Sequence, residues 1–286
     1  MSFRSLYLAA AIGLGMIVAA QAQSFPVTID HAFGQTTVPA KPQRIVTWGW
    51  AAQDAVIALG EVPVGIPYFA YGGDENGTLA WTREAVAELG AEFPAILPNA
   101  VDPPIEAIAA LQPDLILAVY SGISQEQYEV LSGIAPVIAY PDAPWSTPWQ
   151  DTIRITGEAL GKGAEADALV AELEQFIVDE TAKYPEVAGA SFAGIAEYNG
   201  EVAVYARHDS RARFLEDAGM VTPQSVIDLA SADSFFFSLS FENLDRLDSD
   251  ILISYFETPE ADVAFFGNPV VALAPQVAKG AVARVV

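Results

Sequence analysis

A segment that occurs twice constrains the fold of this chain more than any other feature. Residues 104–120 read PIEAIAALQPDLILAVY, and residues 240–256 read SFENLDRLDSDILISYF. At an offset of 136 residues the copies share three identities: Glu106 with Glu242, Leu111 with Leu247, and Asp114 with Asp250. In each copy apolar residues recur at helix-like spacing, and an Asp then precedes a continuous apolar block. Such a block is typical of a strand covered on both faces of a parallel sheet, so the repeat predicts two lobes of similar α/β build.

Strand-like and helix-like patterns alternate through both halves of the chain. A hairpin pattern at residues 25–39 opens the first half, and α/β alternation continues to about residue 140 and resumes after about residue 190. Between the halves, the sequence AEADALVAELEQFIVDETAKY contains neither Gly nor Pro and predicts a single helix roughly 30 Å long. We therefore expect a first lobe at 23–162, an interlobe helix at 163–186 and a second lobe at 187–286.

The first 22 residues have the pattern of a secretory signal peptide. Arg4 precedes an apolar core, and Ala20-Gln21-Ala22 matches the small-x-small cleavage motif, so we expect cleavage after Ala22. A membrane anchor is the alternative, although the apolar part is short for a membrane span. The chain contains no Cys, which excludes a lipidated Cys at the cleavage site. We expect a mature protein that is not inserted in the membrane and is retained in a periplasm.

Composition and charge limit the classes of partner. The 286-residue chain is 52% hydrophobic yet carries a formal net charge of −24. This combination indicates a large apolar core inside an acidic surface. An acidic surface argues against nucleic acid and anionic membranes as partners.

Aromatic residues gather where the predicted strands end. In open α/β sheets, ligands bind beyond the carboxyl ends of the strands. The aromatic residues expected at those ends are Trp48, Trp50, Tyr68, Tyr71, Tyr120, Tyr198 and Tyr255. One Trp after a strand is usually part of the core, but several from different strands favour an aromatic pocket.

Basic residues are scarce, and three of them lie within seven positions. Arg207, Arg211 and Arg213 indicate an anion-binding site, because the guanidinium fork suits oxyanions. The alternative is that they form ion pairs with Asp209, Glu216 and Asp217 on a helix surface. Helical spacing places Arg213 near Asp217, so Arg213 is the one expected to have a structural role. Arg83 in the first half is a possible opposing clamp.

Motifs of catalysis and metal binding are absent from the sequence. It contains no G-x-S-x-G, no H-E-x-x-H and no Cys nucleophile, so we expect no enzyme activity and no catalytic residue. The only two histidines, His31 and His208, are too few for a His-rich metal site, and we expect no protein metal site and no cofactor. His31 is expected at the surface of the hairpin. His208 lies among the arginines and could touch a ligand.

The order of these segments resembles the iron-siderophore (FecB-like) substrate-binding proteins of ABC importers. The resemblance rests on TIDHAFGQTTVPAKPQRIVTWG, IEAIAALQPDLIL, TGEALG before a long helix, and FENLDRLDSDILIS. It implies two Rossmann-like lobes with mostly parallel sheets, joined by one long rigid helix, with the ligand in the cleft between them. Relatives usually continue through a further helix beyond the AVARVV end, so an incomplete second lobe is an open alternative.

The resemblance also implies a function and a set of site residues. The expected function is capture of an anionic ferric siderophore by a monomer and its delivery to the permease dimer of an ABC importer, with iron present only in the ligand. The expected ligand contacts are Trp48, Trp50, Arg83, Tyr120, Arg207, Arg211 and Tyr255. Glu106 and Glu242 are the expected contacts with the permease.

Two alternatives remain open at this point. The same scaffold serves for cobalamin or haem, and an unrelated possibility is a secreted α/β hydrolase with an unrecognised carboxylate or serine. The class of siderophore is not determined by the sequence, because catecholate, hydroxamate and carboxylate chelates all accept arginine and aromatic partners.

Overall fold

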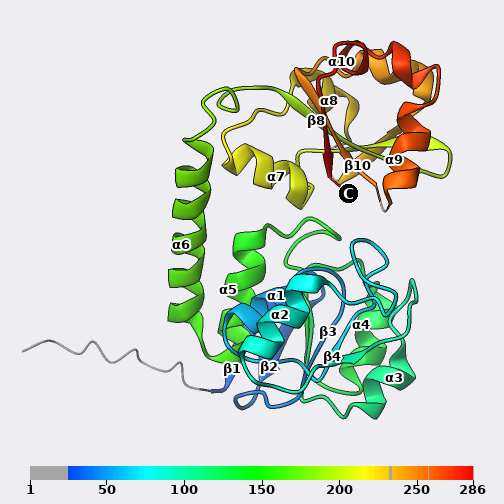
Figure 1. Ribbon diagram of the computed structural model, residues 1–286. Helices are drawn as coiled ribbons and strands as arrows, with labels where there is room; N and C mark the ends of the chain where they lie inside the picture. The colour runs from blue at the N-terminus through cyan, green and yellow to red at the C-terminus, as the bar shows by residue number, and fades with distance from the viewer. Residues whose placement is uncertain (1–24, 232–233, 257, 286) are drawn as a thin grey trace, which may run out of the picture.

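The protein consists of two α/β lobes connected by a long helix. The computed structural model describes residues 25–231, 234–256 and 258–285, and the expected signal peptide lies outside these residues. Helix α6 (Gly163–Thr181) runs along one side of the molecule from the first lobe to the second (Figure 1). Its 19 residues correspond to roughly 28 Å. The helix ends earlier than the predicted limit of residue 186, because residues 182–190 form turns.

A five-stranded parallel sheet forms the centre of the first lobe. Its strand order is β5-β4-β3-β6-β7, and every neighbouring pair is parallel, as the apolar blocks predict. The strands are β3 (Ile45–Thr47), β4 (Gly65–Ile66), β5 (Ala95–Ile96), β6 (Leu115–Ala118) and β7 (Val137–Ala139). The helices of this lobe are α1 (Ala52–Ala58), α2 (Ala80–Glu88), α3 (Ile105–Ala110), α4 (Gln125–Ser132) and α5 (Trp149–Leu160). Strand β6 is completely buried, in keeping with its unbroken apolar sequence.

The sheet of the second lobe is mixed rather than mostly parallel. Its order is β10-β9-β8-β11-β12, and only the β8–β11 and β11–β12 pairs are parallel. The strands are β8 (Phe192–Tyr198), β9 (Glu201–Tyr205), β10 (Phe236–Leu239), β11 (Ile251–Tyr255) and β12 (Val282–Val285). The helices are α7 (Ser210–Asp217), α8 (Gln224–Leu229), η1 (Phe241–Arg246), α9 (Pro259–Phe266), η2 (Val271–Leu273) and α10 (Pro275–Ala278).

A tight turn accounts for this difference. Asn199 and Gly200 both have positive φ, 53° and 77°, and connect β8 directly to β9 as an antiparallel hairpin. Asn-Gly is a strong signal for such a two-residue turn. A two-residue connection leaves no room for the crossover that parallel strands require.

The duplicated segment occupies equivalent places in the two lobes. The first copy forms α3 and β6, the second forms η1 and β11, and β6 and β11 are both fourth in their sheets. Asp114 accepts bonds from the backbone N–H groups of Gln43 and Arg44, each 2.8 Å long. Asp250 accepts from the backbone N–H of Ser191 at 2.8 Å and from its hydroxyl at 2.7 Å. The shared Asp therefore fastens the entry of a central strand to its neighbour in both lobes.

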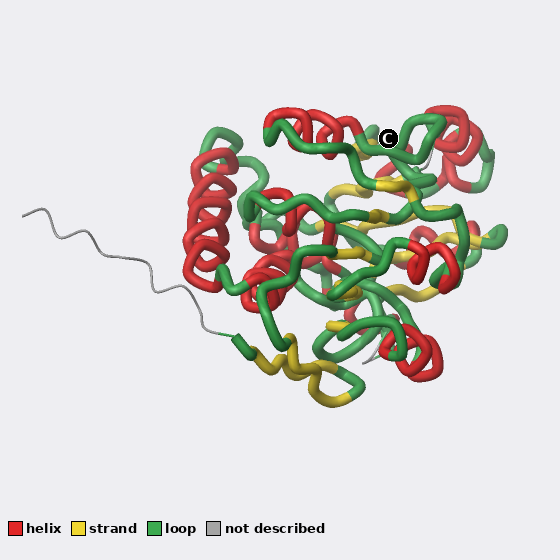
Figure 2. The backbone as a smooth tube through the Cα atoms, turned by 90° about the horizontal axis from the view of Figure 1, so that it is seen from below, coloured by secondary structure: helices red, strands yellow, loops and turns green. Residues whose placement is uncertain are grey.

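The N-terminal hairpin packs at the edge of the first lobe. Strands β1 (Val27–His31) and β2 (Gly34–Val38) pair antiparallel, and Figure 2 shows them apart from the larger sheets, beside the grey trace. The expectation that His31 is a surface residue was wrong, because its side chain is buried against Tyr128. Its Nε2 lies 2.9 Å from the Thr36 hydroxyl. Burial lowers the pKa of His31, although Asp30 opposes this effect.

None of the helices in the described ranges has the character of a membrane span. Within residues 25–285, apart from the three positions not described, none combines the length and apolar character that a bilayer crossing requires.

Candidate functional site

Loops from the two lobes meet where the strands of the parallel sheet end. The Ser210 hydroxyl at the start of α7 donates to the Tyr120 hydroxyl, which follows β6 in the other lobe, over 2.7 Å. The Tyr71 hydroxyl of the first lobe donates to the backbone carbonyl of Val285 at the end of β12, over 3.3 Å. These bonds bring side chains from both lobes into one region.

Arg211 occupies the second-lobe side of this region. Its Nε and Nη2 donate to the two carboxylate oxygens of Asp209, both over 2.8 Å. Asp209 is completely buried and also caps α7 by accepting from the Arg211 backbone N–H. The guanidinium lies over the ring of Tyr205 at 3.5 Å and is 5.7 Å from the ring of Tyr255. Arg211 is therefore held by a buried carboxylate beneath and by aromatic faces beside it.

A glycine allows these two tyrosine rings to lie side by side. The Tyr205 and Tyr255 centroids are 5.6 Å apart in an edge-to-face arrangement. Gly194 on the intervening strand β8 lies beneath them, and a Cβ there would be 3.2 Å from the Tyr205 ring and 3.6 Å from the Tyr255 ring. A Cβ here would be an ordinary contact for Tyr255 but a tight one for Tyr205, whose ring would have to shift by a few tenths of an ångström.

The charges of this cluster are fixed at neutral pH. Burial disfavours the charged form of Arg211, but hydrogen bonds and attraction from Asp209 outweigh it and raise its pKa. Burial raises the pKa of Tyr120 to about 12, with a smaller contribution from the charge of Asp209. Burial likewise raises the pKa of Tyr255 to about 12, although the Arg211 charge lowers it. The tyrosines are thus neutral hydrogen-bonding groups around a permanently charged Arg.

Aromatic rings line the first-lobe side. Trp50 packs edge-on against Phe69 at 5.3 Å and lies 6.2 Å from the ring of Tyr71. Tyr120 packs edge-on against Trp145 at 5.9 Å. Trp50 remains 38% exposed, so its ring is available to a ligand.

The loops that carry these rings are locked together. Gly49 has φ 95°, and a Cβ at this position would lie 2.3 Å from the carbonyl oxygen of Tyr120. The close approach allows the Trp50 backbone N–H to donate to that carbonyl over 2.9 Å. The Trp50 and Tyr120 loops are therefore positioned relative to one another by backbone contacts.

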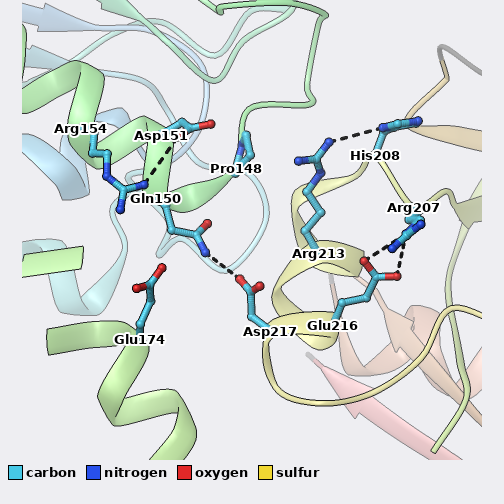
Figure 3. Close-up of a pocket in the computed structure, with 10 residues that line it drawn as sticks. All are labelled: Pro148, Gln150, Asp151, Arg154, Glu174, Arg207, His208, Arg213, Glu216 and Asp217. Carbon is cyan, nitrogen blue, oxygen red and sulfur yellow. Dashed lines mark hydrogen bonds and ion pairs between the residues drawn. The ribbon is translucent and has the colours of Figure 1, made fainter. Parts of the chain in front are cut away.

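A separate polar hollow is lined by residues of α5, by Glu174 of helix α6 and by residues of the second lobe (Figure 3). Its volume is about 500 Å³. Its lining consists of Pro148, Gln150, Asp151, Arg154, Glu174, Arg207, His208, Arg213, Glu216 and Asp217. Within the hollow, Arg207 pairs with Glu216 at 3.0 Å, and Gln150 donates to Asp217 over 2.9 Å. Four carboxylates face three arginines, so this hollow has no excess of positive charge.

The structure brings together four of the seven expected ligand contacts. Trp50, Tyr120, Arg211 and Tyr255 belong to the aromatic region between the lobes. Trp48 is 8% exposed and belongs to the first-lobe core. Arg83 on α2 pairs with Asp74 at 2.8 Å, and Arg207 lines the polar hollow.

The expected ion pair between Arg213 and Asp217 was wrong. Arg213 instead approaches Nδ1 of His208 at 3.4 Å (Figure 3). Asp217 accepts bonds from Trp149 and Gln150 of α5 in the other lobe. The carboxylate is thus used for an interlobe contact, which helical spacing alone cannot reveal.

The sequence reasoning missed several residues of the region. These are Tyr205, Ser210 and Trp145. The pairing of Arg211 with Asp209 and of Arg207 with Glu216 was the alternative that the sequence left open, and the structure shows both pairs. A signal was present for Asp209, because an Asp directly before a helix is a typical N-cap. No comparable signal marked Trp145, which lies in an irregular loop.

The two repeated glutamates lie at corresponding surface positions. Glu106 is in the first turn of α3 and Glu242 is in the first turn of η1, and both are exposed. An acidic residue in a first turn also favours the helix dipole.

The described residues do not contain a recognisable metal-binding group. Across residues 25–231, 234–256 and 258–285, no three His, Cys, Asp or Glu side chains are grouped as metal ligands would be.

Known proteins resemble the chain over most of its length. The sequence profile of the family described as "Periplasmic binding protein" matches residues 45–285. The probable siderophore-binding lipoprotein YfiY of Bacillus subtilis is 27% identical over 242 residues, which cover 83% of this chain and 70% of YfiY. The Fe(3+) dicitrate-binding periplasmic protein FecB of Escherichia coli is 28% identical, over 59% of this chain and 54% of FecB. The crystal structure of Streptococcus pneumoniae PiaA in complex with ferrichrome has a TM-score of 0.82 and 36% identity, over 90% of this chain and 88% of PiaA.

Proposed function

The chain belongs to the periplasmic binding protein family, and from this premise we propose that it captures a ferric siderophore for an ABC importer. The observation that carries the proposal is the region where Arg211, Tyr255 and Tyr120 meet across the two lobes. A permanent cation between aromatic rings offers stacking surfaces and hydrogen bonds to the oxygens and linkers of an iron chelate. Iron enters as part of the cargo and not as a resident cofactor.

The relatives support this cargo. PiaA was solved with ferrichrome, and YfiY and FecB are described as binding a siderophore and ferric dicitrate. In this chain Trp50 and Tyr120 from one lobe and Arg211 and Tyr255 from the other would contact the chelate. The protein binds and releases its ligand without making or breaking covalent bonds.

The proposal extends to location and partners. We expect a periplasmic monomer that presents Glu106 of one lobe and Glu242 of the other to a permease dimer. Both glutamates are exposed at equivalent places in the repeated segment, which suits two similar docking sites on a two-subunit partner.

Tryptophan fluorescence tests the proposed cargo. The chain has five Trp residues, and Trp50 and Trp145 lie in the aromatic region. Titration with ferrichrome, ferric enterobactin and ferric citrate should give saturable quenching by at least one chelate. Trp50→Ala should weaken that binding about tenfold, or about 1.4 kcal/mol. Trp81→Ala is the matched control, because Trp81 is 56% exposed on α2 and contacts Asp54 instead of the aromatic region.

The same titration includes haem and cyanocobalamin. Saturable quenching by haem or cyanocobalamin alone would identify that compound as the cargo in place of a ferric siderophore. The family assignment would be unchanged. A lack of saturable response to every chelate would overturn the proposed cargo.

A further inference from the structure

The arginines close to the lobe junction are matched by carboxylates. Arg211 donates hydrogen bonds to both carboxylate oxygens of Asp209. Arg207 donates to both oxygens of Glu216 over 3.0 and 3.3 Å. Arg284 on β12, the strand whose end accepts the Tyr71 bond, pairs with Asp262 at 3.1 Å. The charge of each of these cations is therefore balanced before a ligand arrives.

The pair formed by Arg211 and Asp209 is the least able to separate. Asp209 is fully buried, and among the residues that the structure describes its carboxylate accepts bonds from Arg211 alone, through the side chain and the backbone N–H. Moving the guanidinium toward a ligand anion would leave a buried carboxylate without its counter-charge, which is strongly unfavourable. Only Nε and Nη2 bond to Asp209, so the guanidinium can still donate a hydrogen bond through Nη1 without giving up its partner.

Arg83, which was an expected ligand contact, and Arg213, which was expected to have a structural role, do not supply an excess of positive charge. Arg83 is held by Asp74, whose Oδ1 also accepts bonds from the backbone N–H groups of Asn76 and Thr78. Arg213 faces the polar hollow, where carboxylates outnumber arginines four to three. With a formal net charge of −24, the molecule as a whole repels anions.

The tyrosine side chains between the lobes are uncharged. Burial raises the pKa values of Tyr71 and Tyr205 as well as those of Tyr120 and Tyr255, so all four phenols remain protonated at neutral pH. Trp50 and Trp145 contribute apolar ring surface. This surface suits a ligand without net charge.

We propose that the cargo is an electrically neutral ferric chelate of the trihydroxamate class, and not the anionic chelate expected from the arginine cluster. This inference rests on the proposed function. Each of three hydroxamates loses one proton on binding iron, so together they cancel the charge of Fe³⁺. Three catecholates lose two protons each and leave a triply negative complex, and the described residues around the cleft carry no excess of positive charge to offset it.

Affinity and its salt dependence test the inference in the unaltered protein. Ferrichrome is the neutral probe, and ferric enterobactin is the anionic catecholate probe. Ferrichrome should bind at least tenfold more tightly, and its Kd should change less than about twofold between 20 and 500 mM NaCl, because no net charge is paired on binding. Tighter binding of ferric enterobactin that weakens with salt would overturn the neutral-cargo inference and leave the proposed function standing. Binding of neither probe nor ferric citrate would overturn the proposed function.

Asp209→Asn provides the complementary test. Asn keeps a side-chain oxygen for the helix cap but releases the charge of Arg211. The affinity for ferric enterobactin divided by the affinity for ferrichrome should increase at least tenfold. The Kd of ferric enterobactin should also become salt-sensitive. Asp245→Asn removes the same charge from an exposed position in η1 and should leave the ratio unchanged.

A second variant covers the case in which Asp209→Asn does not fold. Glu216→Gln releases Arg207, which is 63% exposed at its side chain, and should shift the ratio in the same direction. An unchanged ratio in every folded variant would overturn the inference.

Discussion

At the scale of single residues, Gly49 determines how the two aromatic loops of the first lobe approach each other. Ala at this position would combine a left-handed φ of 95° with a Cβ only 2.3 Å from the Tyr120 carbonyl oxygen. We expect Gly49→Ala to lower the free energy of unfolding by at least about 2 kcal/mol. Gly90→Ala is the control, because Gly90 also has a positive φ, 64°, but open space around a Cβ, and should cost about 1 kcal/mol. Equal losses in urea unfolding would contradict the role given to the close contact.

His31 gives the stability a pH dependence. Its pKa is lowered by burial, so protonation is harder in the folded state than in the unfolded chain, where the value is near 6.5. The stability from neutral His31 is therefore present above pH 6.5 and lost as the pH falls through the lowered pKa. His31→Gln should remove this part, so the stability difference between variant and parent should shrink from pH 7.5 to pH 5. If denaturant unfolding gives the same stability difference between variant and parent at pH 7.5 and at pH 5, the role given to His31 is contradicted.

At the scale of elements, α5 and α7 form a contact between the lobes. Trp149 and Gln150 of α5 both donate to one oxygen of Asp217 at the end of α7, over 3.1 and 2.9 Å. Asp217→Ala should weaken this contact between the lobes by about 1 kcal/mol, because the exposed bonds exchange with water. The fraction of molecules in which α5 and α7 are separated should then increase roughly fivefold.

Because the chain contains no Cys, spin labels attached to two introduced cysteines can measure the distance between the lobes. Val130→Cys on α4 and Val263→Cys on α9 place spin labels at exposed sites, one in each lobe. The interlobe distance distribution should shift to longer distances in Asp217→Ala. Asp167→Ala, which alters an exposed carboxylate of α6 bonded to Arg154, is the control and should leave it unchanged.

The elements also show what the sequence could and could not predict. The apolar blocks at β6 and β11 predict buried strands because burial on both faces leaves a local mark. The hairpin of β8 and β9 was missed although Asn199-Gly200 signals it. The aromatic residues of the site could be listed from strand ends. The pairing of Arg211 with Asp209 could not be chosen over ligand binding, because it depends on burial that only the folded lobes create.

At the scale of the whole molecule, we expect helix α6 to limit the motion of the lobes. A helix that connects two lobes bends much less readily than a pair of flexible strands, and Ala166 and Val170 anchor its first half in the core of the first lobe. Ligand binding should therefore cause only a small change in radius of gyration, on the order of 1 Å in X-ray scattering. A large compaction on saturation with ligand would show that α6 does not act as a stiff connection.

The duplicated segment places one exposed glutamate on each lobe, and the proposed docking role of this pair can be tested separately from ligand binding. Glu106→Ala and Glu242→Ala each remove one exposed carboxylate from a first helical turn. Neither residue contacts the aromatic region, so the Kd of the chelate should stay within about twofold of the parent value. Uptake of iron-labelled chelate by cells that carry the importer should fall at least fivefold, since a loss of roughly 1 kcal/mol at a charged contact corresponds to that factor.

The double variant and a control decide between docking and a general loss of charge. If each lobe meets its own permease subunit, Glu106→Ala combined with Glu242→Ala should reduce uptake by about the product of the single effects. Glu172→Ala on α6 removes an equally exposed carboxylate away from both repeats and should leave uptake unchanged. Loss of ligand affinity in either single variant would refute the docking assignment, because the carboxylate would then be part of the binding site itself.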